Sequence, residues 1–245
     1  MVRVSIHQPV YFPWLGFFHK LMLSDIYVVL DDCQAIKQSW MNRVMIKQNL
    51  DKKWITVPIL KKHRSKQLVK DMEINYNADW VKKHLSAVRM NYSKAMYFDE
   101  IYEILSLVLS KKYKYLIDLN VDGMSRLIKL LKINIKIVFS SDLDYVKAES
   151  TERLINIVKS VNGNIYISGQ GGSSYLKPEL FAANNIDLIY QNYRHYHYDQ
   201  LGDEPFMDGL SIIDTYTNTG HKGVYDLIKK NEKENTRSYG NKVGI

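Results

Sequence analysis

A His–Gln pair is the clearest candidate for chemistry in this sequence. His7 and Gln8 directly follow an apolar run at residues 2–6 and precede two prolines. An imidazole can accept a proton or contact a phosphate, and a neighbouring amide can orient it, so we assign both residues to the catalytic group. Tyr11 and Trp14 follow in the same proline-stiffened loop, and we assign them to a substrate-binding wall. The alternative is a helix-start loop whose histidine bonds only the backbone.

Two adjacent carboxylates follow a second apolar run. Asp31 and Asp32 come directly after residues 26–30, and Gln34 lies just beyond them. Because carboxylates at a strand end hold a divalent cation or a ribose hydroxyl, we assign Asp32 to the catalytic group and Asp31 and Gln34 to substrate binding. Side chains alternate along a strand, so we expect only one of the two carboxylates to face a crevice, without deciding which. The alternative is one solvated carboxylate and one helix cap.

A third polar segment lies further along the chain. Trp40, Asn42 and Arg43 offer a stacking indole, an amide and a guanidinium close together. Because a guanidinium binds phosphate or carboxylate in a bidentate manner, we assign Arg43 to the anionic end of a substrate. Trp40 and Asn42 are assigned to the same binding surface. An exposed salt bridge is the alternative for Arg43.

A glycine-rich segment follows the apolar run at residues 164–167. It is assigned to substrate binding, and its candidate residues are Ser168, Gly169, Gly171, Gly172 and Tyr175. Closely spaced glycines between a strand and a helix allow backbone N–H groups to face an anion. The spacing matches neither the dinucleotide-binding fingerprint nor the P-loop, so the position at a strand end is what favours function.

The stretch at residues 193–198 is dense in aromatic rings and imidazoles. His195 and His197 are assigned to substrate binding from this stretch, and a strand edge with stacked rings is the alternative. We predict no metal site, because the two histidines lack a third ligand. Cys33 is the single cysteine of the chain, and nothing in its neighbourhood supports a role as nucleophile.

Short apolar runs alternate with helical patterns along the chain. We predict strands at residues 2–6, 26–30, 135–139, 164–167 and 187–190, with two further extended pieces at 54–59 and 67–74 forming a hairpin or sheet edge. The fold class is therefore α/β, with a mostly parallel, Rossmann-like sheet, helices on both faces and a helical C-terminal part. Ligands bind such sheets beyond the carboxyl ends of the strands. Most of the polar segments described above fall there.

Composition and charge narrow the class of protein. The 245 residues carry a formal net charge of +8, are 46% hydrophobic and show no linker or repeat, so we predict one α/β domain over residues 1–228 and a polar, frayed tail over 229–245. The lysines are scattered, which favours a solvated basic surface over a nucleic-acid footprint. Apolar runs fall short of the roughly 20 residues that cross a bilayer. With one cysteine and no signal-like start, we expect a cytoplasmic protein.

Several of these motifs, in this order, resemble the WbqC-like family of bacterial proteins. The matching segments are HQPVYFPWLGFFHK, LDDCQ, SWMNRV, WITVPI, YISGQGG and LSIID, which together span about residues 1 to 220. Two positions depart from the family pattern. Val10 stands where the family usually has Asn, and Cys33-Gln34-Ala35 stands where it often has Val-Gln-Phe. The second departure argues against Cys33 as an essential nucleophile.

The resemblance implies a role in surface-polysaccharide or O-antigen biosynthesis. The leading hypothesis is a transferase that moves an acyl or aminoacyl group to an amino sugar carried on a nucleotide. The alternative is a non-catalytic module that binds a nucleotide sugar or a glycan carrier. The expected partner is a nucleotide-linked sugar or another small anionic substrate, with no stable nucleic-acid complex and no membrane insertion. The sequence identifies no cofactor and leaves a homo-oligomer open.

A second resemblance concerns topology alone. A strand, a histidine-containing loop, a helix and a second strand look like the opening of the nucleotidylyltransferase and pantothenate synthetase class. That class has a His-x-Gly-His signature, which is absent here. The likeness is therefore an analogy of fold and carries no residue roles.

Overall fold

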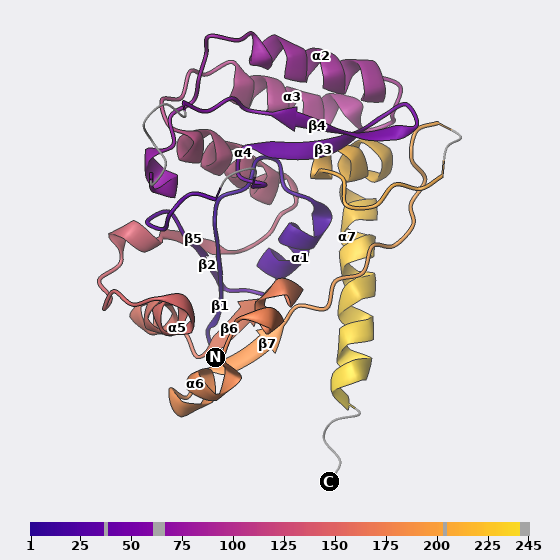
Figure 1. Ribbon diagram of the computed structural model, residues 1–245. Coiled ribbons are helices and arrows are strands. Elements are labelled where there is room, and N and C mark those ends of the chain that lie inside the picture. Colours follow the sequence, from indigo (N-terminus) through magenta and orange to yellow (C-terminus); the bar gives the residue numbers. More distant parts are fainter. Residues whose placement is uncertain (37–38, 61–66, 203–204, 241–245) are drawn as a thin grey trace.

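A parallel sheet organises the protein. The computed structural model describes residues 1–36, 39–60, 67–202 and 205–240, and in these residues the sheet has five strands in the order β5-β2-β1-β6-β7 (Figure 1). The strands are β1 (Arg3–His7), β2 (Ile26–Val29), β5 (Lys136–Phe139), β6 (Ile165–Ser168) and β7 (Asp187–Tyr190). All neighbouring strands are parallel. The predicted Rossmann-like α/β class is confirmed, whereas the likeness to nucleotidylyltransferases stays a prediction.

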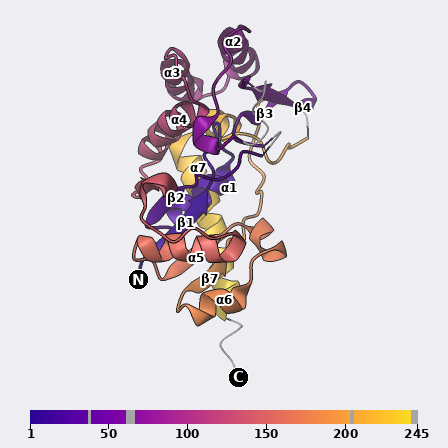
Figure 2. The same ribbon diagram turned by 60° about the vertical axis from the view of Figure 1, so that its left-hand side comes forward.

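Helices pack on both faces of the sheet, as predicted. They are α1 (Leu15–Met22), α2 (Trp80–Tyr92), α3 (Phe98–Leu109), α4 (Leu116–Leu130), α5 (Ser150–Ser160), α6 (Pro178–Ala183) and α7 (Ile212–Gly240). Helices α5 and α6 share an apolar core with Val4, Ile6 and Val28, which point to one face of the sheet. The remaining helices share a larger core with Tyr27 and Val29, which point to the other face. Figures 1 and 2 show these two layers.

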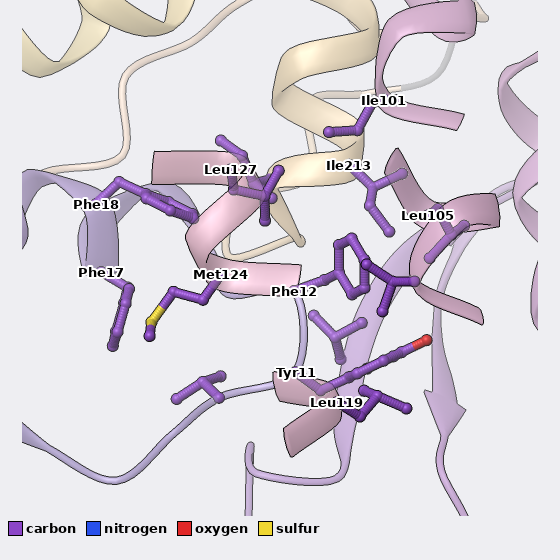
Figure 3. Packing of buried hydrophobic residues seen from close by; sticks show 14 of the residues in the cluster. Tyr11, Phe12, Phe17, Phe18, Ile101, Leu105, Leu119, Met124, Leu127 and Ile213 are labelled. Atoms are coloured by element: carbon purple, nitrogen blue, oxygen red, sulfur yellow. The ribbon is translucent and has the colours of Figure 1, made fainter. Parts of the chain in front are cut away.

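The loop after β1 is part of the larger core. Tyr11 and Phe12 are buried and pack against side chains from several helices, among them Leu119, Met124 and Ile213 (Figure 3). The Tyr11 hydroxyl lies 3.0 Å from Nδ1 of the buried His84. Apolar burial and this hydrogen bond therefore fix the loop in position.

A separate hairpin consists of β3 (Arg43–Gln48) and β4 (Asp51–Thr56). Trp54 was predicted to begin an extended piece paired with residues 67–74, but its strand partner is Met45. The predicted pairing survives only as a bridge between Ile59 and Ile74. Strand β3 is joined to β4 by a short turn at residues 49–50. Pairing these two strands is favoured, because closing a short loop costs less entropy than closing a long one.

Helix α7 extends the folded part of the chain beyond residue 228, where the sequence places the domain boundary. The side chain of Asn231 is buried and accepts a hydrogen bond from the Arg194 backbone N–H at 2.7 Å. This anchor explains why the helix continues past the boundary to Gly240. Residues 241–245 of the predicted tail lie outside the described residues.

Gly220 breaks the regular geometry of α7. Its φ of 64° and ψ of −173° lie outside the helical region, and a Cβ atom at this position would approach the Tyr97 ring to 2.7 Å. Both the backbone angle and the close contact favour glycine.

We predict that Gly220→Ala lowers the free energy of unfolding by about 2 kcal/mol, because it adds backbone strain and a steric clash with Tyr97. Urea denaturation measures the change. Gly171→Ala is the matched control, since its Cβ would meet no atom within 4 Å. A Gly220→Ala protein as stable as this control would contradict the packing described for α7.

Candidate functional site

The strand order creates one topological switch point. The chain passes from β1 to β2 and β5 on one side of the sheet, then crosses to β6 and β7 on the other side. The crevice of such a sheet lies where the connections diverge, here beyond the carboxyl ends of β1 and β6. The register pairs Ser5 with Ile167. Extending it by two residues places Gly169 beside His7, two residues that the sequence assigned to one site.

His7 presents a neutral, oriented imidazole at this edge. Its Nδ1 lies 2.8 Å from the Gln8 carbonyl oxygen, so Nδ1 carries the proton and Nε2 keeps its lone pair. Among the described residues, Nε2 has no hydrogen-bond partner. Protein atoms crowd the ring although one side remains exposed to solvent. This partial desolvation, followed by the positive charge of Lys20, lowers the pKa of His7 below its ordinary value.

Gln8 orients His7 through its backbone and not through its side chain. Its side-chain Nε2 donates instead to the Cys33 thiol at 3.0 Å. Burial raises the pKa of the Cys33 thiol above its ordinary value, although the hydrogen bond from Gln8 acts in the opposite direction. Cys33 therefore remains a thiol at neutral pH, which agrees with the absence of a nucleophilic role in the sequence analysis.

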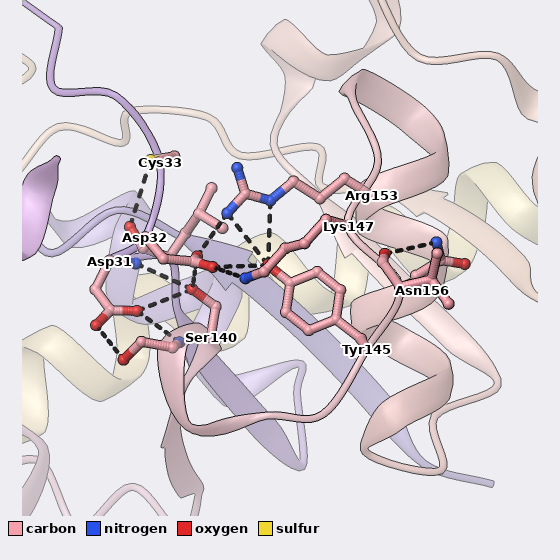
Figure 4. A network of polar contacts seen from close by, with 11 residues as sticks. Asp31, Asp32, Cys33, Ser140, Tyr145, Lys147, Arg153 and Asn156 are labelled. Atoms are coloured by element: carbon pink, nitrogen blue, oxygen red, sulfur yellow. Dashed lines mark hydrogen bonds and ion pairs between the residues drawn. The ribbon is translucent and has the colours of Figure 1, made fainter. Parts of the chain in front are cut away.

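Asp32 is the centre of a polar network (Figure 4). Its carboxylate lies 2.5 Å from both the Lys147 ammonium and the Arg153 guanidinium. It also accepts hydrogen bonds from the Tyr145 hydroxyl at 3.0 Å and from the Ser140 hydroxyl. Desolvation alone would raise the pKa of Asp32, but the hydrogen bonds from Lys147, Ser140 and Tyr145 and the charge of Arg153 hold it well below its ordinary value.

This environment changes the role expected for Asp32. Both carboxylate oxygens are occupied by internal donors, and the side chain is only 7% exposed. A carboxylate held in this way is a poor base for a substrate. We therefore revise the sequence-based assignment: Asp32 is better placed to position Arg153 and Lys147 than to act as a catalytic group.

Asp31 shares the Ser140 hydroxyl with that network and joins two strand ends (Figure 4). It accepts hydrogen bonds from the Ser140 hydroxyl at 2.9 Å, the Ser141 backbone N–H at 2.9 Å and the Ser141 hydroxyl at 2.6 Å. These contacts tie the end of β2 to the end of β5. Asp31 is buried, so its contacts are structural and leave no free oxygen directed at a ligand.

Four residues of the network were missed by the sequence analysis, and Ser140, at the end of β5, is one of them. Tyr145 and Lys147 lie in the loop after β5, and Arg153 lies in the first turn of α5. The Arg153 Nε and Nη2 atoms donate to Tyr145 and Asp32. Its remaining nitrogen has no hydrogen-bond partner among the described residues and points toward Cys33 in Figure 4. Their position after the third predicted strand was the available signal, because that strand ends at the same edge.

The glycine-rich segment forms a short 3₁₀ helix, η3 (Gln170–Ser174). Gly172 is needed for packing, because its Cβ would lie 2.1 Å from the Ser168 hydroxyl. Gly169 and Gly171 have no atom within 4 Å of a Cβ position, so the backbone there is open. Tyr175 after the helix is exposed. The segment thus offers open backbone at two of its three candidate glycines, of which Gly169 follows the strand next to that of His7.

Trp14 packs against the loop after β7. Its ring centroid lies 5.0 Å from that of Tyr193 and 5.1 Å from that of His195, whereas His197 packs on Phe206 at 5.0 Å. This loop lines a small pocket together with α7, and its lining residues are Leu15, Tyr193, His195, Tyr196, Tyr198, Phe206, Asp208, Gly209, Leu210 and Thr215. Trp14 and His195 therefore belong to an aromatic surface of their own, while Tyr11 lies in the core.

The segment around Arg43 packs against the loop that follows His7, since the Tyr11 N–H donates to the Trp40 carbonyl at 3.2 Å. Asn120 donates from one side-chain nitrogen to the Pro9 carbonyl at 3.3 Å and to the Met41 carbonyl at 2.8 Å. The Arg43 guanidinium lies 4.2 Å from the centroid of the Trp54 ring, and Trp40 packs on the same ring.

Two other predicted residues have local roles. Asn42 donates to the Val57 carbonyl at 2.9 Å and so holds the hairpin to the chain that follows it. Gln34 is exposed and bridges to Leu68. No group of three metal-binding side chains occurs in the described residues, and every helix described is too short or too polar to span a bilayer.

We predict that Asp32→Asn lowers the free energy of unfolding by about 2 kcal/mol at pH 7, because charged hydrogen bonds to Lys147 and Arg153 are lost. The pKa of Asp32 is lower in the folded protein, so its contribution is present above pH about 4 and is lost as the pH falls further. Urea denaturation at pH 7 and pH 3 measures both effects. Asp142→Asn, at an exposed position, is the control. Equal stability of the two variants at pH 7 would count against the network.

Comparison with known proteins confirms the family that the motifs resemble. The sequence matches the WbqC-like protein family over residues 8–225, which includes every strand end of the site except His7. An uncharacterized protein of Mycobacterium tuberculosis is 33% identical over 224 residues, covering 90% of this chain and 95% of that protein. No solved structure gives a significant match. The chain therefore belongs to the WbqC-like protein family.

Proposed function

We propose that this protein is an enzyme of bacterial surface-polysaccharide assembly that transfers an acyl or aminoacyl group to an amino sugar carried on a nucleotide. The main support for the proposal is the tautomer and orientation of His7 at the topological switch point. Its Nδ1 is held by the Gln8 carbonyl, and its Nε2 keeps a lone pair directed to no protein group that the structure describes. A positioned neutral imidazole is the usual base for activating a nucleophile.

The transfer requires one proton acceptor. The amino group of the sugar attacks the carbonyl carbon of an activated acyl donor, such as a thioester or an acyl phosphate ester. A C–N bond forms and the bond from the carbonyl carbon to the leaving group breaks. The proton lost by the nitrogen goes to His7 Nε2, which returns it to the leaving group. His7 is then neutral again, so the cycle is balanced.

The surroundings of His7 fit an anionic substrate. Lys147 and Arg153, paired with Asp32, contribute positive charge beside the end of β2. The open backbone at Gly169, at the end of β6, offers additional donors. Nucleotide-linked sugars are anionic and are made in the cytoplasm, so the proposal includes a cytoplasmic location. Stable binding of nucleic acid is not expected, because the lysines are scattered along the sequence and form no basic cluster there.

A second candidate is a non-catalytic module that binds a nucleotide sugar or a glycan carrier. One observation favours it: the other ionisable groups of the crevice are engaged. The Asp32 carboxylate is paired with cations, and the Cys33 thiol has a raised pKa. The role of His7 then distinguishes the two candidate functions, since the enzyme needs a base and a binding module does not.

We predict that His7→Ala lowers kcat by at least about 100-fold with little change in KM, because the base acts in the transition state. Mass spectrometry measures transfer from acetyl-CoA or an aminoacyl adenylate to UDP- and dTDP-linked amino sugars. The free energy of unfolding is expected to change by less than about 1 kcal/mol, since the ring is exposed.

His221→Ala, on helix α7, is the matched control for this experiment. Transfer by His7→Ala at the wild-type rate would contradict a catalytic role for His7. Binding of a nucleotide sugar by the wild-type protein without any transfer would favour the binding module.

A further inference from the structure

Lys20 is a buried lysine in an otherwise apolar helix. Only 4% of its surface is exposed, and it lies one turn after Gly16 on the same face of α1. The Gln191 side chain donates to the Gly16 carbonyl at 2.6 Å, which places the end of β7 against that face. The sheet-facing side of α1 therefore carries Lys20 toward the strands around the switch point.

The direction of the Lys20 side chain follows from the direction of the helix. The loop at residues 8–14 leads from the carboxyl end of β1 directly into α1, so the helix begins at the edge where the strands end. Long side chains in a helix lean toward its N-terminus. The ammonium of Lys20 is thus directed back toward the edge that carries His7.

Contacts around one aromatic ring support this position. The Lys20 ammonium lies 5.8 Å from the centroid of Phe17, and the His7 ring meets Phe17 edge-on at 5.6 Å. The charge of Lys20 also acts on His7 directly, since it contributes to the lowered pKa of that imidazole. Lys20 and His7 therefore both lie against the Phe17 ring, near the end of β1.

No counter-charge accompanies Lys20 in the part of the chain that the structure describes. Its ammonium makes no hydrogen bond or ion pair with a described residue, and its pKa is lowered to about 8 by burial alone. The nearby titratable groups are neutral at pH 7. Burial lowers the pKa of His7 and brings that of His19 to about 4, and it raises that of Tyr27. Burying an ammonium without a counter-charge costs free energy of folding. We infer that a bound anionic ligand supplies the counter-charge.

Two further buried polar atoms lie on the same side of the sheet. Ser5 points to the face covered by α1, because Val4 and Ile6 on either side of it pack into the opposite core. The Ser5 hydroxyl and the His19 Nε2 are fully buried and lack hydrogen-bond partners among the described residues. His19 Nδ1 accepts from Gln191 at 2.8 Å, so Nε2 carries the proton and is a donor. The side of the sheet covered by α1 therefore holds two further buried polar groups without hydrogen-bond partners among the described residues.

We propose that Lys20 is a substrate-binding residue whose buried ammonium holds a phosphate oxygen of the ligand beneath the crevice between β1 and β6. The proposal rests on the proposed function for its ligand class, a nucleotide-linked sugar, and adds the residue that recognises the diphosphate. The charge of Lys20 adds to the burial that lowers the pKa of His7, so a phosphate that neutralises this charge also makes His7 a stronger base. Lys20 ends the segment HQPVYFPWLGFFHK that carries the family resemblance, but the sequence analysis gave it no role.

Binding without turnover tests this anchor separately from the chemistry. Isothermal titration of UDP-N-acetylglucosamine and inorganic pyrophosphate is measured at pH 7.5 with the wild type, Lys20→Met, Lys20→Arg and the control Lys222→Met, whose lysine is exposed. We expect Lys20→Met to weaken binding of both probes by at least about tenfold, Lys20→Arg to retain part of the affinity and Lys222→Met to match the wild type. Lys20→Met affinity within twofold of the wild type, or no binding of either probe by the wild type, would overturn the proposal.

The pH dependence gives a second test that needs no apolar variant. Above its pKa of about 8, Lys20 loses its charge, whereas an arginine keeps it. The ratio of wild-type to Lys20→Arg affinity for UDP-N-acetylglucosamine is therefore expected to fall at least about fivefold between pH 7.5 and pH 9.5. The ratio cancels titration of the ligand and of the other groups. A constant ratio would overturn the proposal.

The melting temperature without ligand distinguishes a ligand-binding role of Lys20 from a structural one. Because the folded pKa of Lys20 lies below its ordinary 10.5, the charged form disfavours folding at pH 7.5 and the cost is relieved as the pH rises above 8. Lys20→Met should therefore melt at the same or a higher temperature than the wild type. A lower melting temperature, or failure to fold, would show that the ammonium makes structural contacts and would overturn the proposal. Phosphate-dependent binding without acyl transfer would support the anchor and contradict only the proposed enzymatic step.

Discussion

The parallel pairing of β1 with both β2 and β6 is the constraint on which the rest of the structure depends. The register pairs Ser5 of β1 with Ile167 of β6, and the Leu30 N–H after β2 donates to the His7 carbonyl at 2.9 Å. A shift of one of these strands by one residue would turn its side chains to the opposite face of the sheet. His7 would then no longer meet the loop that carries Gly169.

The charged and polar groups at the carboxyl edge of the sheet have different roles. Asp32 gathers two cations into a fixed arrangement, and a carboxylate bound so tightly stabilises the site without taking part in proton transfer. The Gln8 carbonyl sets the tautomer of His7. Burial, with a smaller contribution from the charge of Lys20, keeps His7 neutral, and the positive charges at this edge favour an anionic ligand. The same groups thus define the protonation state of the base and the charge of what it binds.

Local patterns predicted the elements well, because they depend on side chains near in sequence. The apolar run at residues 187–190 became β7 with the expected bounds. The pattern could not reveal that Tyr11 would be buried, since an aromatic residue suits both a core and a pocket wall. It also could not pair Asp32 with Arg153, which lies 121 residues away. Lys20 was overlooked for a related reason: a single lysine in a helix is usually solvated, and only the packing of α1 on the sheet buries it.

The central claim is that ligand binds at the edge formed by β1, β2 and β6, and hydrogen–deuterium exchange tests it most directly. Exchange is measured with and without saturating UDP-N-acetylglucosamine, resolved by peptide. The account predicts slower exchange in the segments at residues 7–10, 30–34 and 168–175, because bound ligand reduces local opening there. Slower exchange confined to the hairpin at residues 43–56 or to the aromatic loop at 193–202 would contradict it.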